Sequence, residues 1–243
     1  DEIDVAETLR LKYRYLDLRR PSAQKNLLTR HKFLAVVRNH LNENGFIDVE
    51  TPILYKSTPE GARDFIVPSR MNPGTFFALP QSPQILKQLL MVSGMDRYYQ
   101  IARCFRDEDL RADRQPEFTQ LDIEMSFIQE RDIQDLIERM LHQVFKKVLN
   151  ITLDIPLRRI TFDEAFSRYG CDKPDLRFGL EIHDMTTLFA ATELTFLKTI
   201  LGRGGKIGGI HVSGADFSRS DLEGWVAHAQ KLGASGLVWM RVK

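Results

Sequence analysis

The richest concentration of potential chemistry lies between Phe105 and Phe118 (FRDEDLRADRQPEF), where arginines alternate with acids. Most of these charges are typical of a solvated loop, whose ion pairs contribute little to stability. Arg106 differs because it directly follows an expected strand, so its guanidinium would project from a rigid element. A rigid arginine can bind a phosphate or carboxylate through two parallel hydrogen bonds. Glu108 could orient this arginine or accept a hydrogen bond from an amino group.

A second charged cluster is the segment Thr58–Asp64 (TPEGARD), which places Glu60, Arg63 and an aspartate around Gly61. Glycine makes such a loop mobile, and mobile charged loops can act as lids over binding sites. The same composition is typical of plain surface, which the spacing alone favours.

A third cluster is the segment Gln81–Gln88 (QSPQILKQ), which predicts an amphipathic helix beginning at its second or third residue. Gln84, Lys87 and Gln88 would share one face, with leucines on the other. That polar face is either solvated, which the pattern favours, or a wall that binds a small anionic substrate.

The cysteines and histidines predict no second site. Cys104 and Cys171 are the only cysteines, and the six histidines are scattered, so no disulfide framework or metal-ligand spacing is present. Both thiols are expected to be reduced, as in a cytoplasmic protein, and Cys104 is expected to be a core thiol on a strand. The residue patterns therefore predict one anion-binding site on an antiparallel hairpin.

Length and charge limit the remaining possibilities. The 243 residues suffice for one large domain or two ordinary ones. Lys and Arg total 34 against 33 acids, so any contact with nucleic acid must come from a local patch, and a polybasic membrane binder is not indicated. No apolar run approaches the roughly 18 residues of a membrane helix. The acidic start without methionine predicts further sequence upstream.

The elements that must position the charged clusters follow from hydrophobic periodicity. Helices are expected at Pro21–Asn44, Gln84–Ser93 and Asp132–Leu149, the last with Asp132 as its N-cap. Strands are expected at Phe46–Leu54, Phe65–Val67, Arg97–Phe105 and Phe118–Phe127. The last two strands, around a loop of roughly ten residues, predict a long antiparallel hairpin.

The pattern changes near Pro156, where shorter elements and Gly-rich turns begin, so we expect a domain boundary at about 155–160. Beyond it, helices are expected at Asp163–Tyr169 and Ser220–Leu232, and strands at Glu193–Ile200, Ile207–Val212 and Gly236–Val242. Both parts are therefore expected to be α+β.

Two short strings resemble the signatures of class II aminoacyl-tRNA synthetases: GFIDVETP at 45–52, after a long helix, and FRDE at 105–108. Three longer strings, at 58–64, 79–84 and 106–122, resemble the bacterial aspartyl-tRNA synthetases in particular. Lysyl and asparaginyl relatives share the general signatures but not the TPEGARD loop. In the second part, 172–177 and 214–216 resemble the start of the inserted domain of bacterial aspartyl-tRNA and archaeal glutamyl-tRNA amidation enzymes.

This resemblance implies a division into three regions. Residues 1–20 would link to an upstream anticodon-binding domain, and 21–157 would form the N-terminal half of a class II catalytic domain, an antiparallel sheet flanked by helices. Residues 158–243 would be an incomplete inserted α+β domain of the GAD type. Nothing in the chain matches the third signature, with its second ATP-binding arginine, or the late acids that hold Mg²⁺. The resemblance therefore predicts a fragment that is inactive by itself.

The resemblance also implies roles for individual residues. Arg106 is implied to be catalytic, because it would hold both the ATP α-phosphate and the aspartate carboxylate. The residues implied to bind aspartate are Glu60, Gln84, Lys87, Arg106 and Asp122. Those implied to bind ATP are Arg106, Asp107, Glu108 and Gln115. Pro52 is implied to lie at the interface of a homodimer.

The implied reaction is the ATP-dependent conversion of L-aspartate to aspartyl-adenylate, followed by transfer to tRNA. The carboxylate attacks the α-phosphorus directly, so catalysis rests on positioning two anions and on stabilising charge with Arg106 and Mg²⁺. Two other readings stay open: a paralogue that activates an amino acid for another purpose, and a non-catalytic binding or regulatory protein.

Overall fold

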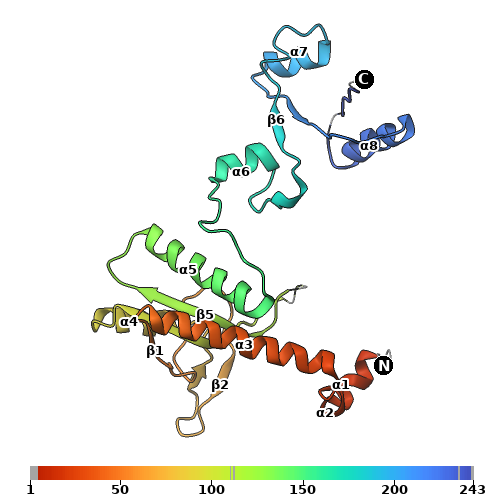
Figure 1. Cartoon of the computed structure of the whole chain (residues 1–243). Helices are drawn as coiled ribbons and strands as arrows, with labels where there is room; N and C mark the ends of the chain where they lie inside the picture. Colours follow the sequence, from red (N-terminus) through yellow and green to blue (C-terminus); the bar gives the residue numbers. More distant parts are fainter. Residues whose placement is uncertain (1–4, 110, 112, 235, 242–243) are drawn as a thin grey trace. The chain divides into compact units, whose positions relative to one another are not determined.

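The chain divides into two compact units, Asp1–Leu157 and Arg158–Lys243 (Figure 1). The computed structural model describes residues 5–109, 111, 113–234 and 236–241. Within those residues, no helix is both long and apolar enough to cross a membrane.

The first unit is built around an antiparallel hairpin of two nine-residue strands, β4 (Arg97–Phe105) and β5 (Glu117–Met125). The hairpin pairs Arg97 with Met125 at one end and Phe105 with Glu117 at the other. A short strand, β1 (Ile47–Asp48), pairs in parallel with the beginning of β4. The other elements are α1 (Glu7–Lys12), α2 (Arg14–Asp17), α3 (Pro21–Glu43), β2 (Ile66–Pro68), β3 (Phe76–Ala78), α4 (Gln84–Val92), α5 (Glu130–Val144) and the π-helix η1 (Phe145–Leu149).

Alternation along the hairpin strands gives the sheet two faces. The helix-covered face, which includes Tyr99, Ile101, Leu121 and Ile123, packs against α3 and α5. Fully buried residues of α3, such as Leu41, form the centre of this apolar core. We call the opposite side of the hairpin the α4 face, because α4 reaches it through side-chain contacts. Its buried residues are Tyr98, Gln100, Ala102, Cys104 and Asp122.

The end of α3 shows how local sequence sets this arrangement. Gly45 has a φ of +76°, a left-handed conformation that glycine adopts without strain. The backbone N–H groups of Gly45 and Phe46 donate to the carbonyls of Asn42 and Leu41, at 3.0 Å each. This is the Schellman arrangement that ends many helices. It reverses the chain so that Phe46 enters the core and β1 follows beside β4.

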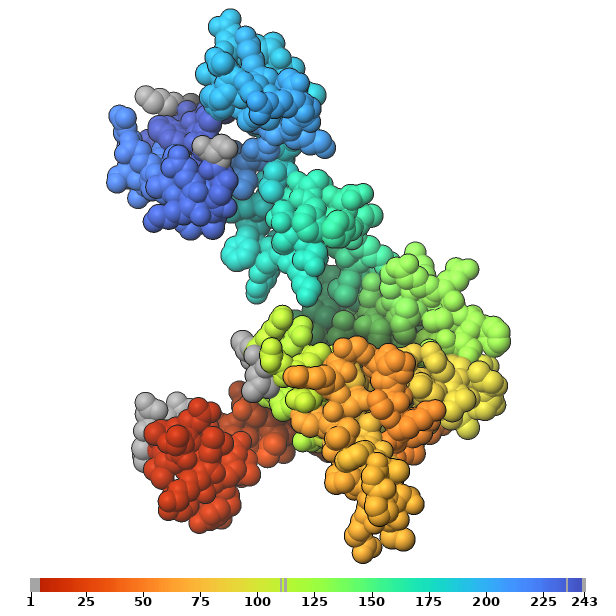
Figure 2. Space-filling model, turned by 180° about the vertical axis from the view of Figure 1, so that it is seen from behind, coloured from red at the N-terminus to blue at the C-terminus, as the bar shows by residue number. Residues whose placement is uncertain are grey.

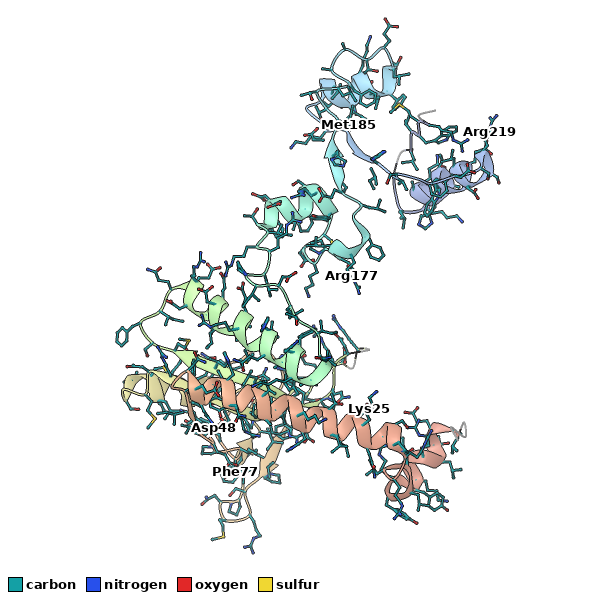
Figure 3. The ribbon with its side chains drawn as sticks, in the orientation of Figure 1. Lys25, Asp48, Phe77, Arg177, Met185 and Arg219 are labelled. Atoms are coloured by element: carbon teal, nitrogen blue, oxygen red, sulfur yellow. The ribbon has the colours of Figure 1, made fainter. Side chains whose placement is uncertain are left out.

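Strands β2 and β3 form a separate hairpin that projects from the first unit as a narrow finger (Figure 2). Much of its apolar surface is exposed, with Met71 at 78% and Ile66 at 60%. Figure 3 labels Phe77 in β3 and Asp48 at the end of β1. Near the base of the finger, Tyr55 and Ala78 exchange backbone hydrogen bonds, which ties the finger to the chain that follows β1.

The second unit contains α6 (Phe162–Tyr169), the 3₁₀ helix η2 (Leu176–Phe178), β6 (Ile182–Asp184), α7 (Thr195–Gly202), β7 (Gly208–Ile210) and α8 (Arg219–Lys231). β6 and β7 pair as an antiparallel ribbon. Arg168 of α6 forms ion pairs with Glu181, before β6, and with Glu164 on its own helix. Among the described residues of this unit, only Ala165 and Leu197 are buried apolar side chains.

The expected α+β composition is confirmed, as are the hairpin and the three long helices, to within a few residues at their ends. The expected strand at Phe46–Leu54 is mostly wrong, because only Ile47–Asp48 pair with β4. Asp132 is not the N-cap of α5: that position is Gln129, and Asp132 is the third helical residue of a capping box.

Two expected strands of the second unit are wrong. Glu193–Ile200 lies mostly in the helix α7, where Phe196, Leu197 and Ile200 recur at helical spacing. Residues 236–241 form no strand, and the expected end at Val242 falls outside the described residues.

Candidate functional site

The centre of the α4 face is an ion pair between a helix and a strand. Lys87 of α4 is 8% exposed, and its Nζ lies 2.9 Å from Oδ1 of Asp122 and 3.1 Å from Oε2 of Glu124. Both acids stand on β5 at alternate positions, so they share one face of the sheet. The expectation that the polar face of α4 is solvated is therefore wrong at Lys87. Leu89, one of the leucines on the face opposite the polar residues, is 56% exposed.

The net effect of burial and the neighbouring charges is to raise the pKa values of Asp122 and Lys87 in this cluster. Burial raises the pKa of Asp122, repulsion from Glu124 and Glu60 raises it further, and Lys87 offsets part of the change. Burial acts to lower the pKa of Lys87, but its hydrogen bonds and attraction to Asp122 and Glu124 outweigh this and leave it above its usual value. The two acids therefore stabilise the charged form of Lys87.

Glu60 reaches the same region from the loop before the finger. Its carboxylate accepts hydrogen bonds from Ser82 Oγ (2.6 Å), just before α4, and from Thr58 Oγ1 (2.9 Å). The loop is held at two further points. Gln81 binds Ala62, while the backbone N–H of Asp107 donates to the carbonyl of Arg63 (3.0 Å). In this structure the TPEGARD segment is packed against α4 and the end of β4.

Arg106 leaves the end of β4 with its backbone fixed, because its N–H donates to the carbonyl of Pro116 (2.9 Å). Its guanidinium carbon lies 5.2 Å from the centre of the Phe118 ring, a cation–π contact. Two buried polar atoms have no hydrogen-bond partner within the described part of the chain: Arg106 Nε at the loop end of the hairpin, and Asp122 Oδ2 near its middle. Buried polar atoms are nearly always paired, so both are candidate contacts for a ligand.

The pKa of Cys104, on the α4 face, responds to several of these charged groups. Burial raises the pKa of this thiol to about 11, Asp122 and Glu60 contribute by repulsion, and Arg106 acts in the opposite direction. The groups that act on one thiol therefore come from β5, the TPEGARD loop and the end of β4. The thiol is fully buried, which confirms a core cysteine rather than a nucleophile.

The other predicted residues lie around this centre or away from it. Gln84 is half-buried at the first position of α4, one helical turn from Lys87. Asp107 is exposed at the start of the hairpin loop, and Glu108 lies 3.8 Å from Arg114 across it. Gln115 is exposed at the other end of that loop. Pro52 lines a hollow of about 490 Å³ beside β4, with Arg38, Thr51 and Gln100 among its other walls. It also lines a second hollow, to which Glu60 and Ser82 contribute.

The structure thus pairs Lys87 with Asp122, places Gln84 one turn before Lys87, and bonds Glu60 to Ser82 just before α4. Arg106 stands at the loop end of the hairpin beside Phe118, and Gln115 is exposed on the hairpin loop. Sequence reasoning missed two residues. Glu124 could have been found, because it stands two positions after Asp122 on a predicted strand and must share its face. Gln81 carried no such signal, because its role depends on the path of a loop 17 to 19 residues earlier.

Comparison with known proteins places this site in a family context. The family model for class II tRNA synthetases (D, K and N) matches residues 6–226. An aspartate–tRNA(Asp/Asn) ligase of Caldanaerobacter subterraneus subsp. tengcongensis is 61% identical over the whole chain. Similarly named ligases of Thermoanaerobacter sp. and Thermodesulfovibrio yellowstonii are each 57% identical, over 100% and 99% of the chain. The chain spans 41% of the length of each of these relatives.

Proposed function

The chain belongs to the class II tRNA synthetases (D, K and N), and from this premise we propose that it forms the aspartate-binding part of an aspartate–tRNA ligase. The reaction would be the activation of L-aspartate by ATP and transfer of the aspartyl group to tRNA. The names of the relatives support this activity over an unrelated paralogue or a non-catalytic protein, and they make tRNA(Asp) and tRNA(Asn) the candidate acceptors.

The observation that carries the proposal is the match between the charges of the site and those of aspartate. The surplus of carboxylates at Asp122 and Glu60 suits the substrate ammonium group, and Asp122 Oδ2 is a buried acceptor with no partner among the described residues. Lys87 suits the side-chain carboxylate, for which it would exchange part of its contact with Glu124. Asparagine offers that lysine a neutral amide in place of a charge, so it should bind less tightly.

Arg106 would act at the reacting end of the substrate. Its guanidinium stands at the end of β4, on the side that also bears Cys104 and Asp122, and its Nε is buried without a partner in the described structure. A guanidinium can pair with the α-carboxylate and the α-phosphate together, which would hold two repelling anions in contact. No side chain is required as a nucleophile, because the carboxylate itself attacks phosphorus. Positioning and charge stabilisation supply the acceleration.

Other roles rest on the family alone. Asp107, Glu108 and Gln115 would contact ATP from the hairpin loop, and Pro52 would lie in a homodimer interface. Residues 21–157 would be part of the catalytic domain and 158–243 part of an inserted domain, in a cytoplasmic enzyme. Family members use Mg²⁺ with ATP. Within the described residues, no group of three or more His, Cys, Asp or Glu is arranged to hold a metal ion.

The deciding experiment is ATP–pyrophosphate exchange by the complete natural protein that contains this chain, with aspartate, asparagine and lysine as alternative substrates. Exchange that depends on aspartate, with much less for the other two, is expected. Equal exchange with asparagine would contradict the role of Lys87. Exchange with lysine but not aspartate would overturn the proposed substrate.

A further inference from the structure

Gln81 is the most deeply buried polar side chain near the site, at 1% exposure, yet neither the charge match nor the proposed chemistry uses it. It lies between Pro80, whose carbonyl accepts from the backbone of β4, and the start of α4. Its whole carboxamide is directed at the TPEGARD loop. Nε2 donates to the carbonyl of Ala62 (2.8 Å) and to Oδ1 of Asp64 (2.5 Å), and Oε1 accepts from the N–H of Ala62 (3.1 Å).

This pairing imitates a β-bridge, because one planar group both donates to and accepts from the backbone of a single residue. Among side chains only a carboxamide offers a donor and an acceptor in that geometry. Ala62 follows Gly61, whose φ of +93° requires glycine, so the amide binds the loop directly after its sharpest bend. Glu60 is on the other side of that bend, where Ser82 holds its carboxylate.

We propose that Gln81 is a positioning residue, which fixes the TPEGARD loop through Ala62 and Asp64 so that Glu60 is held at the Lys87–Asp122 pair. For its effect on substrate, this inference rests on the proposed function. For the loop itself, it stands on the hydrogen bonds alone. A glutamine that merely filled the interior would affect the stability of the whole unit but not the loop in particular, and the two roles can be separated by experiment.

The first test is limited digestion of the complete natural protein by trypsin, which cuts after Arg63 only when the loop is released. In Gln81→Met the volume is kept while all three hydrogen bonds are lost. Cleavage after Arg63 should become about tenfold faster or more, the factor that corresponds to losing one or two hydrogen bonds. Cleavage after the exposed Arg70 of the finger provides an internal reference that should not change.

Two results would overturn the proposal. One is an unchanged rate at Arg63. The other is an equal rise at Arg63 and Arg70, which would mean general destabilisation. Gln134→Met is the matched control: within the described residues Gln134 donates to Glu130 on its own helix, α5, so its loss should leave both rates unaltered.

The second test exchanges donor and acceptor. Gln81→Glu keeps an acceptor for the N–H of Ala62 but places a carboxylate against Asp64, so it should release the loop at least as strongly as methionine does. Adding Asp64→Asn supplies an amide that can donate to the new carboxylate, and cleavage after Arg63 should fall back toward the original rate. An equal cleavage rate in the single and double variants would mean that Asp64 does not help Gln81 to fix the loop, and it would contradict the proposal.

The third test is kinetic. If Gln81 positions Glu60, Gln81→Met should raise KM for aspartate about tenfold or more with a smaller change in kcat, because substrate must now order the loop itself. A structural defect would instead reduce the active fraction, which lowers kcat and leaves KM unchanged, and that result would overturn the positioning role. If the unaltered protein shows no exchange with aspartate, the proposed function fails. The trypsin cleavage rates would still test whether Gln81 fixes the TPEGARD loop.

Discussion

The two faces of the β4–β5 hairpin differ in burial and in the physics behind it. Five strand residues are buried on the α4 face, whereas Tyr99 is the one buried strand residue on the helix-covered face of the described hairpin. On the helix-covered face, Tyr99 is 1% exposed and packs among aliphatic side chains of α3 and α5. On the α4 face, its neighbour Tyr98 is fully buried, and its hydroxyl donates to Gln100 (2.8 Å) in a polar network that leads toward Asp122. Adjacent residues of one strand therefore belong to an apolar core and to a charged site.

The difference teaches that burial alone does not separate packing from function. Apolar packing is non-directional, so the helix-covered face gains stability from each methylene group that is removed from water. The α4 face holds an ion pair and two unpartnered buried polar atoms, Arg106 Nε and Asp122 Oδ2, within the described structure. Such groups cost desolvation energy, which is acceptable where a ligand completes the pairing. We therefore expect changes on the two faces to have separable effects on stability and on substrate.

The largest effect should come from Arg106→Ala on the α4 side. Loss of a charge positioned at a reacting phosphate costs about a hundredfold to a thousandfold in rate. We expect aspartate-dependent pyrophosphate exchange to fall by at least this factor, while the urea midpoint of unfolding hardly changes, because Arg106 is a partly exposed residue at the end of β4. Unchanged exchange in a folded variant would mean that Arg106 is not part of the site. It would also contradict the expectation that changes on the α4 face act on substrate while changes on the helix-covered face act on stability.

The opposite case is Leu41→Ala on the helix-covered face. Leu41 is fully buried at the centre of the core, and truncation of such a residue costs about 2–5 kcal/mol of stability. Urea unfolding should show this loss, while KM for aspartate in the folded protein stays the same. Leu27→Ala is a matched control, because Leu27 lies on the same helix but is 56% exposed and should cost little. A large rise in KM for Leu41→Ala would mean that the two faces are coupled.

Lys87→Met sharpens the comparison, because it affects both properties. A hydrogen bond to a charged group contributes about 1.5–3 kcal/mol, so KM for aspartate should rise roughly tenfold to a hundredfold, with little change for ATP. The variant should also be less stable at neutral pH, because Asp122 loses its cation. That loss should shrink as pH falls and the acid is protonated. Equal losses for aspartate and ATP would argue against a pocket role for Lys87.

How far the fold could be read from sequence differs between the faces and between the units. The α3 helix, from Pro21 to Glu43, was predictable because its apolar residues recur at helical spacing, with a proline at the first helical position and Gly45 just after the end. β4 was predicted at its exact bounds. Strand β1 was not, because whether the chain from 46 to 54 pairs depends on its neighbours and not on its own composition. The helix α7 was mistaken for a strand because β-branched and aromatic residues there are compatible with both.

The candidate site could be proposed from the sequence only where a charge stands out from its element. Arg106, Lys87 and Asp122 could be proposed from type, position and resemblance, whereas the orientation of α4 could not. A stripe of leucines normally faces the interior, yet here Lys87 faces the sheet, because the two acids on β5 provide its partners. Contacts between segments distant in sequence, such as Gln81 with Ala62, leave no local pattern to read.

His40 should give the helix-covered face a dependence on pH. It is 2% exposed, and its Nε2 donates to the carbonyl of Leu136 (3.2 Å). Burial lowers its pKa, and the nearby Arg139 contributes. Between the folded pKa and the ordinary value of 6.5, the unfolded chain binds more protons, so stability is full above 6.5 and declines as pH falls below it. Urea midpoints from pH 7.5 to 5 should show this decline, and His40→Gln should flatten it. The same slope in the variant would assign the effect to other groups.

The smallest expected effect concerns whether the α4 face is closed to solvent. Burial and the repulsion of Asp122 raise the pKa of Cys104 from 9.0 to about 11, so its reactive thiolate should be about a hundredfold rarer than for an ordinary thiol. With iodoacetamide at pH 8, mass spectrometry should find Cys171, which is partly exposed, modified well before Cys104. In urea both should react. If Cys104 reacts as fast as Cys171 in the folded protein, then solvent reaches the sheet beneath α4. The ion pair between Lys87 and Asp122 would then be a solvent-screened surface contact and not a buried contact that lines a binding site.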